Sequence, residues 1–400
     1  MASALGGPAP WAKPPGWTTT QGGAGGRVLR VTTLAARGPG SLAEALAADG
    51  PRVIEFAVAG HIDLGGRSLT LAHPRVTLAG ETAPSPGVTL INGGLNINTH
   101  DVIVRHLRVR PGAGNRPKKS GWEVDSLATG GGAHDVIVDH CSLSWSTDEN
   151  LSASGPRFQG ANPAEWRKNT SHRITFSHCI VGEGLHDSAH AKGPHSMGSL
   201  IHDNASDIAI FGNLYISNNA RNPLFKGGAR GAVVNNLVHN PGNRIVTYGL
   251  VPSEWQGHAW ERGIMVVVGN VARQGQSTLA TVAFVESRGP CDYFLRDNLY
   301  FAADGRALDA KPNLLDVKGQ PPGKDPAQDP RVLDRAPFWP PGLEARPAAA
   351  ITPWILANAG ARPWDRDAVD RRLVEEARTG GGKIIHFESE VGGHAAAASR

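Results

Sequence analysis

Residues 101–106 read Asp101-Val-Ile-Val-Arg-His106, and residues 135–140 read Asp135-Val-Ile-Val-Asp-His140. Similar short, apolar segments begin at positions 173, 207, 231, 263 and 292, so that successive starts lie 24 to 38 residues apart. Self-similarity with such a period is typical of stacked structural units. Each apolar run is too short for a helix, and the gaps are rich in Gly, Asn and Ser. We therefore expect each unit to contribute strands.

This repeat predicts an all-β fold, a parallel β-helix in which the strands of each coil pair with the coils before and after it. We expect one domain over residues 1–400, with coils from about 28 to 310 and a tail from 311 to 400 packed on the stack. A helix beginning at Ser41 is expected to cap the N-terminal end. The tail is expected to be extended and Pro-rich, with a charged surface helix from Asp365 to Thr379.

Three cysteines, Cys141, Cys179 and Cys291, lack the spacing of a disulfide scaffold or a zinc site. Cys141 and Cys179 each follow a His at the end of a repeat, so we expect them to stack as small buried residues in adjacent coils. A disulfide between these two cysteines is the alternative.

The composition narrows the classes of partner. The formal charge is +4, which favours a polyanion such as nucleic acid or an acidic polysaccharide. No Lys/Arg run with interleaved aromatic residues is present, so we expect no nucleic acid partner. No run of 18 apolar residues is present, so we expect no membrane span. The first residues lack the basic and apolar regions of a signal peptide, which a processed protein would have lost.

Acidic residues recur at matching points of consecutive repeats. They are Glu123, Asp125, Asp148 and Glu149. Cations follow in the next coils. They are Lys192, Arg221 and Lys226. Strands about 4.8 Å apart place residues from three or four coils within roughly 15 Å on one face. Clustered carboxylates repel one another unless a cation joins them, and Ca²⁺ prefers oxygen ligands. The sequence therefore predicts a calcium site that is assembled from separate strands and flanked by positive charge.

Two stretches carry a resemblance to a known family. One is Asp139-His-Cys-Ser-Leu-Ser-Trp-Ser-Thr-Asp-Glu149, and the other is Ala220-Arg-Asn-Pro-Leu-Phe-Lys-Gly-Gly228, followed by Asn235-Asn236. Through them, and over most of its length, the chain resembles the pectate lyase family, the first family of polysaccharide lyases. The resemblance implies a right-handed parallel β-helix, a secreted enzyme, a pectin-type polysaccharide substrate and a Ca²⁺ cofactor. We also expect a monomer.

The resemblance assigns roles to the three cations. Arg221 stands where the family places its catalytic base. Lys226 stands where a second cation, usually Arg, contacts substrate, and Lys192 matches a substrate-binding Lys.

The resemblance also assigns the calcium ligands. Asp125 and Asp148 match two ligand carboxylates, and Glu123 matches the acidic residue two positions before the first. Many members carry a further carboxylate where this chain has Ser152. Glu149 is a candidate replacement, although on a regular strand its side chain is expected to face the opposite side from Asp148.

The implied activity is β-elimination in α-1,4-linked polygalacturonate, which leaves a 4,5-unsaturated end. A lyase of the same fold acting on methylated pectin or another uronan is one alternative, although a pectin lyase would not need Asp125 and Asp148 for calcium. A polygalacturonase-like hydrolase, which needs paired acids, is a second alternative. A non-catalytic polysaccharide-binding solenoid is a third.

Five basic residues precede Glu123. They are Arg108, Arg110, Arg116, Lys118 and Lys119. They form either a solvated loop or a surface that attracts polyuronate.

Overall fold

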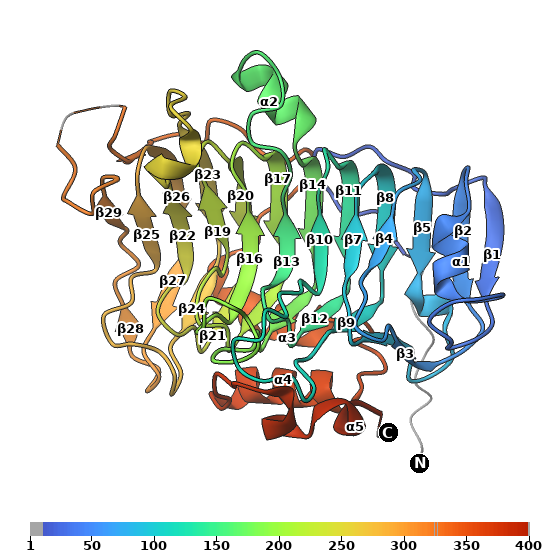
Figure 1. The fold of residues 1–400 in the computed structure, drawn as a ribbon. Helices are drawn as coiled ribbons and strands as arrows, with labels where there is room; N and C mark the ends of the chain where they lie inside the picture. The colour runs from blue at the N-terminus through green and yellow to red at the C-terminus, as the bar shows by residue number, and fades with distance from the viewer. Residues whose placement is uncertain (1–10, 324, 326, 399–400) are drawn as a thin grey trace.

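The chain folds into a stack of coils whose strands form three long sheets (Figure 1). The computed structural model describes residues 11–323, 325 and 327–398. Over these residues the paired strands run parallel, apart from β27 with β28. The expected right-handed parallel β-helix, with a helix at its N-terminal end and a C-terminal tail packed on the stack, is confirmed.

From β2 to β26, successive coils contribute one strand to each sheet in turn. Sheet A contains β1 Arg27–Val31, β2 Arg52–Phe56, β5 Val76–Ala79, β8 His100–Arg105, β11 His134–Asp139, β14 His172–Ser177, β17 Ser206–Phe211, β20 Arg230–Val234, β23 Gly263–Val268, β26 Cys291–Arg296 and β30 Arg331–Val332. Sheet B contains β3 Gly60–Asp63, β6 Val88–Ile91, β9 Arg108–Arg110, β12 Ser142–Ser144, β15 Ile180–Gly182, β18 Leu214–Ile216, β21 Leu237–His239, β24 Val271–Arg273, β27 Leu299–Phe301 and β28 Ala307–Leu308. Sheet C contains β4 Leu69–Leu71, β7 Leu95–Ile97, β10 Leu127–Thr129, β13 Glu149–Ala153, β16 Met197–Ile201, β19 Leu224–Lys226, β22 Val246–Gly249, β25 Val285–Arg288 and β29 Asn313–Leu315.

Helices lie at the margins of the stack. The α-helices are α1 Leu42–Ala47, α2 Pro163–Asn169, α3 Ile351–Asn358, α4 Ala368–Thr379 and α5 Gly393–Ala398, and the 3₁₀ turns are η1 Gly80–Thr82, η2 Pro252–Trp255, η3 Ala348–Ala350 and η4 Glu388–Val391. Ser41 caps α1 by accepting a hydrogen bond from the Glu44 N–H, as expected. None of the helices in the described ranges has the length and apolar character needed to cross a membrane.

The repeats quoted from the sequence are the strands of sheet A. Val102, Val136, Ile174 and Ile208 lie in register across β8, β11, β14 and β17, and all four side chains are fully buried. Burial of one such side chain is worth about 1.5–3 kcal/mol. Because the same position is filled in coil after coil, the apolar contacts run continuously along the solenoid axis and hold neighbouring coils in register.

The polar ends of these repeats make the bends. Asp101, Asp135 and Asp207 have φ angles of 56°, 54° and 56°, in the left-handed region that Asp tolerates better than β-branched residues do. His106 and His140, at the ends of their repeats, have φ angles of 56° and 48°. These two residues turn the chain from sheet A into sheet B.

A line of buried polar side chains links six coils. Its members are Cys141, Cys179, Asn213, Asn236, Asn270 and Asn298. The backbone N–H of each member donates to the side chain of the next, as from Asn213 to Asn236 Oδ1 at 3.0 Å. The cysteines are free and buried, so Cys141 and Cys179 stack as predicted and form no disulfide. We call this line the polar ladder.

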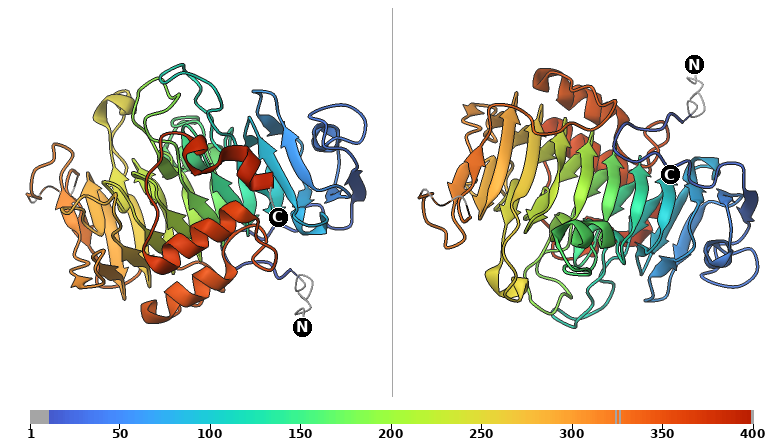
Figure 2. Two further views of the ribbon diagram at one scale, coloured as in Figure 1. Left: turned by 90° about the horizontal axis from the view of Figure 1, so that it is seen from below. Right: turned by 90° about the horizontal axis from the view of Figure 1, so that it is seen from above.

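The tail covers the outer face of sheet B (Figure 2). Ile351 and Ile355 of α3 and Leu373 of α4 pack in one buried cluster with Ile180 and Leu214 of sheet B. The outer face of sheet A packs instead against Trp17 and the segment 338–343. The side chains predicted to act in catalysis lie at neither of these faces but along sheet C.

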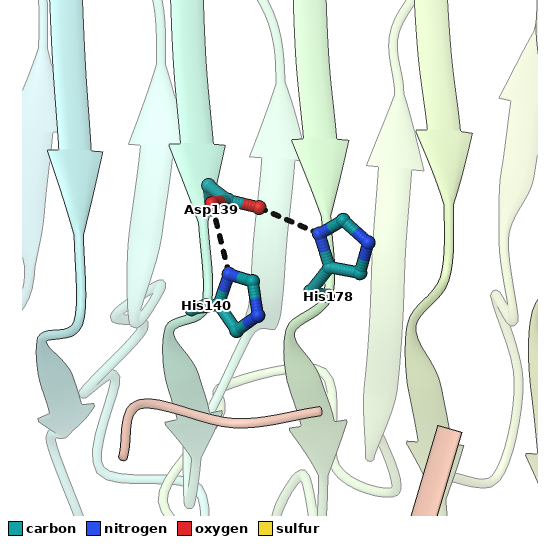
Figure 3. A group of neighbouring side chains, drawn as sticks. All are labelled: Asp139, His140 and His178. Atoms are coloured by element: carbon teal, nitrogen blue, oxygen red, sulfur yellow. Dashed lines mark hydrogen bonds and ion pairs between the residues drawn. The ribbon is translucent and has the colours of Figure 1, made fainter. Parts of the chain in front are cut away.

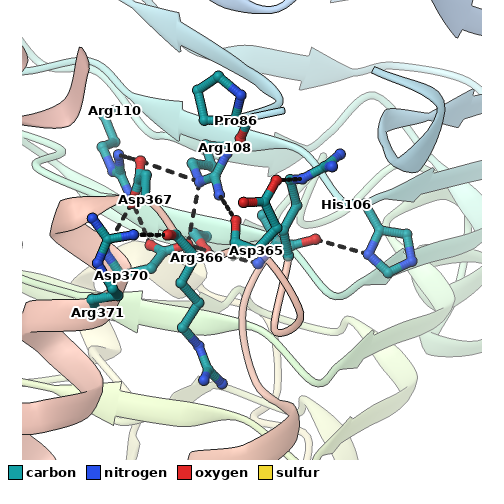
Figure 4. A network of polar contacts seen from close by, with 12 residues as sticks. Pro86, His106, Arg108, Arg110, Asp365, Arg366, Asp367, Asp370 and Arg371 are labelled. Carbon is teal, nitrogen blue, oxygen red and sulfur yellow. Dashed lines mark hydrogen bonds and ion pairs between the residues drawn. The ribbon is translucent and has the colours of Figure 1, made fainter. Parts of the chain in front are cut away.

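Two arginines and two aspartates join the tail to sheet B (Figure 4). Arg110 donates to Asp367 at 2.6 Å and to Asp370 at 2.6 Å. Arg108 lies 3.2 Å from each of the same two carboxylates. All four side chains are at most 2% exposed. We call these four residues the tail cluster.

The tail cluster corrects two expectations. Arg108 and Arg110 are not part of a surface that attracts polyuronate, because both are buried under the tail. The helix expected from Asp365 begins at Ala368 and is capped by Asp367, and one of its faces is buried rather than exposed. The sequence pattern could not show that the tail's acids meet these two arginines.

Candidate active site

Three of the four predicted carboxylates meet at the edge of sheet C. Asp125 lies just before β10, Asp148 just before β13, and Glu149 begins β13. One carboxylate oxygen from each lies within 4.8 Å of those of the other two. Asp125 Oδ1 also accepts a hydrogen bond from the Glu149 N–H at 2.9 Å. We call these three residues the acidic cluster.

The expectation that Glu149 faces away from Asp148 is wrong. Asp148 lies in a bend before β13, so the strict alternation of side chains along a strand begins only after it. Both carboxylates therefore reach the same space, together with Asp125.

The acidic cluster concentrates negative charge in a poorly solvated place. Burial, followed by the charge of Asp148, raises the pKa of Asp125 to about 8. Burial acts to raise the pKa of Asp148, but the hydrogen bond to His195 and the charges of His195, His190 and Arg221 together outweigh it and lower that pKa. Because their pKa values are shifted in opposite directions, Asp125 and Asp148 do not both ionise readily without a further positive charge.

The donor set of the acidic cluster fits a calcium ion. Its ligands are carboxylate oxygens, which Ca²⁺ prefers. Ser152, on β13, is fully buried, and a hydrogen bond from its side chain to Asp125 acts to lower the pKa of that carboxyl. A buried hydroxyl beside Asp125 is one more oxygen that a cation could use.

Glu123 and Lys192 lie beside this cluster. Glu123 Oε1 accepts from the Ala191 N–H at 3.2 Å, and the structure does not bring Glu123 into the three-carboxylate group. Lys192 is exposed, and within the described ranges its Nζ has neither a hydrogen-bond nor an ion-pair partner. The ammonium group of Lys192 is therefore free to meet an anion from solution.

Arg221 contacts the acidic cluster directly. Its guanidinium forms an ion pair with the Glu149 carboxylate, and its side chain is 24% exposed. Its backbone has a φ of 60°, which turns the chain between β18 and β19. Burial lowers the pKa of Arg221, while Asp148 and Asp125 act to raise it. Arg221 therefore pairs with one acid of the cluster and lies close enough to the other two for their charges to act on its pKa.

Lys226 lies further along the groove and is already paired. Its Nζ forms an ion pair with Glu254 and lies 3.6 Å from Asp203. Arg221 and Lys226 line one groove of about 340 Å³, together with Arg244 and Arg288. The lining of the groove also contains Glu254 and Glu286, which pair with three of these four cations.

Two histidines that the sequence reasoning did not single out complete the site. His195 Nε2 lies 2.8 Å from Asp148 Oδ1, and His190 Nε2 lies 3.7 Å from the same oxygen. The two imidazole rings stack with their centroids 3.8 Å apart. Their positions on either side of Lys192, in His190-Ala-Lys-Gly-Pro-His195, were the available signal.

The Asp139-His140 pair of the first motif has a different place (Figure 3). Asp139 accepts hydrogen bonds at 2.8 Å from His140 Nδ1 and from His178 Nδ1, and others from Trp11 and Ser177. Burial is outweighed by these bonds, and the pKa of Asp139 is held well below its ordinary range. With four donors already bound, this carboxylate organises the corner between sheets A and B.

Comparisons with known proteins agree with this picture. A scan against protein-family models finds no match. The chain is 31% identical over 375 residues to a protein from Neosartorya fischeri called probable pectate lyase C, covering 93% of this chain and 78% of the relative. Among solved structures, the major cedar pollen allergen jun a 1 superposes with a TM-score of 0.53 at 15% identity, over 86% of this chain and 90% of the allergen. A pectate lyase bound to hexasaccharide gives a TM-score of 0.53 at 12% identity, over 86% and 94% of the two chains.

The fold and the sequence relatives together define the class: a β-helix lyase. The structural likenesses, at low identity, support the fold alone. The sequence likeness goes further, and the chain belongs to the pectate lyase family.

Proposed function

We propose that the protein is a calcium-dependent pectate lyase that cleaves α-1,4-linked polygalacturonate by β-elimination and releases 4,5-unsaturated oligogalacturonates. The observation that carries the proposal is the contact between the acidic cluster and Arg221, which puts oxygen ligands suited to Ca²⁺ beside a basic side chain. Because the substrate is a polymer, the proposal includes secretion and action outside the cell, as a monomer.

The difficult step is removal of the proton on C5 of a galacturonate. That carbon bears a carboxylate, so the departing proton leaves a second negative charge beside an existing one. Calcium held by Asp125, Asp148 and Glu149 would supply electrostatic stabilisation of this charge. Lys192, which is exposed, binds the substrate carboxylate. Arg221 takes the C5 proton, and the C4 oxygen leaves with its bonding electrons.

Arg221 can act as a base only if some of it is neutral, and a guanidinium is ordinarily always charged. Burial works in the right direction, since it lowers the pKa of Arg221. Asp148 and Asp125 work against it, so neutralising them with a cation removes the charges that keep Arg221 protonated. An alkaline activity optimum follows from this balance.

Lys226 has a subsidiary part in the proposal. Because Glu254 and Asp203 already hold its ammonium group, it is fixed in place on the groove wall. It contributes a positioned charge for a uronate carboxylate next to the one at Arg221.

The test uses polygalacturonate with and without a calcium chelator. A rise in the ultraviolet absorbance of the unsaturated product, abolished by chelator and restored by added Ca²⁺, is the expected result. New reducing ends without that absorbance would show a hydrolase instead. Faster cleavage of methylated pectin, with no effect of the chelator, would show a pectin lyase. Binding without any cleavage would show a polysaccharide-binding solenoid.

A further inference from the structure

A second group of ligand atoms lies beside the acidic cluster. One ligand atom each of Asp148, His190 and His195 lies within 4.8 Å of the others, and this group differs from the acidic cluster in offering two imidazole nitrogens. We propose that these three residues bind one transition-metal ion of the Zn²⁺, Mn²⁺ and Co²⁺ class, at a site separate from the calcium ligands except for the shared Asp148.

The spacing of the ligand atoms matches such an ion. Metal–ligand bonds of about 2.1 Å keep neighbouring ligand atoms about 3.0 Å apart in an octahedral site and about 3.4 Å apart in a tetrahedral one. The two distances from Asp148 Oδ1, 2.8 Å to His195 Nε2 and 3.7 Å to His190 Nε2, bracket these values. The two imidazole rings stack only 13° from parallel, so one ring must rotate out of the stack before both nitrogens can point at one ion.

The two histidines are buried and incompletely used. The His190 side chain is 2% exposed and that of His195 is 7% exposed. Among the described residues, His190 Nε2 has no hydrogen-bond partner, because 3.7 Å to Asp148 is too long for one. A ring nitrogen that lies 3.7 Å from a carboxylate oxygen without bonding to it leaves room for a ligand between the two.

The donor set selects the kind of metal. Imidazole nitrogen suits Zn²⁺, Mn²⁺, Co²⁺ and similar ions, whereas Ca²⁺ takes oxygen ligands. Two nitrogens and one carboxylate also leave coordination positions open to water. The acidic cluster thus prefers Ca²⁺, and the group with two histidines prefers a transition-metal ion. Asp148 can offer one oxygen to each ion.

A second carboxylate, that of Glu123, lies on the Nδ1 side of the His190 ring. Glu123 Oε1 lies 3.6 Å from His190 Nδ1, which currently accepts a hydrogen bond from the Lys192 N–H at 3.1 Å. Binding of a metal at Nε2 requires the ring proton on Nδ1, so the Lys192 bond is exchanged for a bond to Glu123. Carboxylates that hold a ligating His in this way strengthen metal binding.

The position of the site indicates what a bound ion would do in the structure. His190 and His195 flank Lys192 on the loop between β15 and β16, and Asp148 belongs to the preceding coil. One ion would tie that loop to the coil stack and fix the backbone around Lys192. The site itself does not rest on the proposed lyase reaction.

Cobalt is the probe, because its visible absorption reports nitrogen ligands. Protein stripped with chelator is titrated with Co²⁺, alone and in excess Ca²⁺, without substrate. One equivalent of bound Co²⁺ with a visible absorption band is expected. His190→Ala and His195→Ala are each expected to weaken binding at least tenfold and Glu123→Gln about 10- to 100-fold, whereas His73→Ala, an exposed histidine elsewhere, is expected to leave it unchanged.

Circular dichroism and thermal unfolding check that each variant is folded, and His190→Asn and His195→Asn replace any alanine variant that is not. Absence of the visible band, or equal Co²⁺ affinity in the histidine variants, would overturn the proposal. Cleavage of polygalacturonate with Ca²⁺ alone is measured separately. If the protein does not cleave polygalacturonate with Ca²⁺, the proposed function is contradicted, but the conclusion from the cobalt titration still holds.

Discussion

Two clusters in this molecule are both built from arginine and carboxylate side chains. They differ in the balance of positive and negative charge. The tail cluster pairs two arginines with two aspartates, all buried, at 2.6 to 3.2 Å. The acidic cluster sets three carboxylates against one arginine, Arg221, with His195 hydrogen-bonded to Asp148. The first is neutral and complete, which suits a structural joint. The second retains unpaired negative charge, which suits a site that completes itself with a cation and substrate.

The strongest test of this comparison is Arg221→Lys. Lysine keeps a positive charge near Glu149 but removes the group proposed to take the proton, so turnover is expected to fall roughly 100- to 10,000-fold with little change in stability. Initial rates on polygalacturonate measure the loss. Arg30→Lys, at an exposed position on β1, is the control. Retained turnover in Arg221→Lys would remove Arg221 from the role of base.

The tail cluster predicts a stability effect in place of a catalytic one. Arg110→Met leaves Asp367 and Asp370 buried without their main partner, which is expected to cost about 3–5 kcal/mol in the free energy of unfolding. Denaturant unfolding measures it. The double variant Arg110→Met with Asp367→Asn, which keeps Asp370 as the partner of Arg108, is expected to recover part of the loss. Equal stability of Arg110→Met and the parent would show that the tail does not depend on these pairs.

Low pH is expected to weaken the contact between the tail and the coils, because His106 becomes protonated. Burial, followed by the charge of His140, lowers the pKa of His106 to about 4, so the folded protein keeps this ring neutral while it donates to Ala361 O of the tail. The unfolded chain takes up its proton near pH 6.5. Stability is therefore expected to fall by roughly 2–3 kcal/mol as the pH drops from about 6.5 to about 4.

Unfolding free energies measured across that range test this prediction. His106→Phe, which cannot be protonated, should lose this part of the pH dependence. If the variant and the parent have the same slope below pH 6.5, His106 is not responsible for the acid sensitivity.

The smallest expected effect concerns Ser152. Ser152→Asp adds a fourth carboxylate to the unbalanced cluster, and calcium affinity is expected to rise about tenfold, or roughly 1.4 kcal/mol. Calorimetric titration measures the affinity, with Ser152→Asn as a control that adds size without charge. Unchanged affinity in Ser152→Asp would place Ser152 outside the cation site.

Local patterns predicted much of this molecule. The stacked strands, the Ser41 cap and the stacking of Cys141 on Cys179 follow from short patterns within single coils. The tail cluster was not predictable in this way, because Arg110 and Asp367 are 257 positions apart and neither lies in a recognisable motif. The orientation of Glu149 was missed because a bend, which the alternation rule ignores, precedes its strand.

The histidines beside Asp148 show a different limit. His190 and His195 lie in plain view around Lys192, but a histidine in a loop has many uses. Only the coil stack, which brings Asp148 within 2.8 Å of His195, distinguishes a ligand from a surface residue.

The polar ladder has a consequence for the order in which the chain is made. Each N–H in it donates to a side chain from the following coil, as Asn236 N–H does to Asn270 Oδ1. During synthesis from the N-terminus, the newest coil therefore carries an amide whose ladder acceptor is missing until the next coil is made. Along the ladder we expect growth of the solenoid to be directional, because each added coil supplies the side chain that completes the coil made before it.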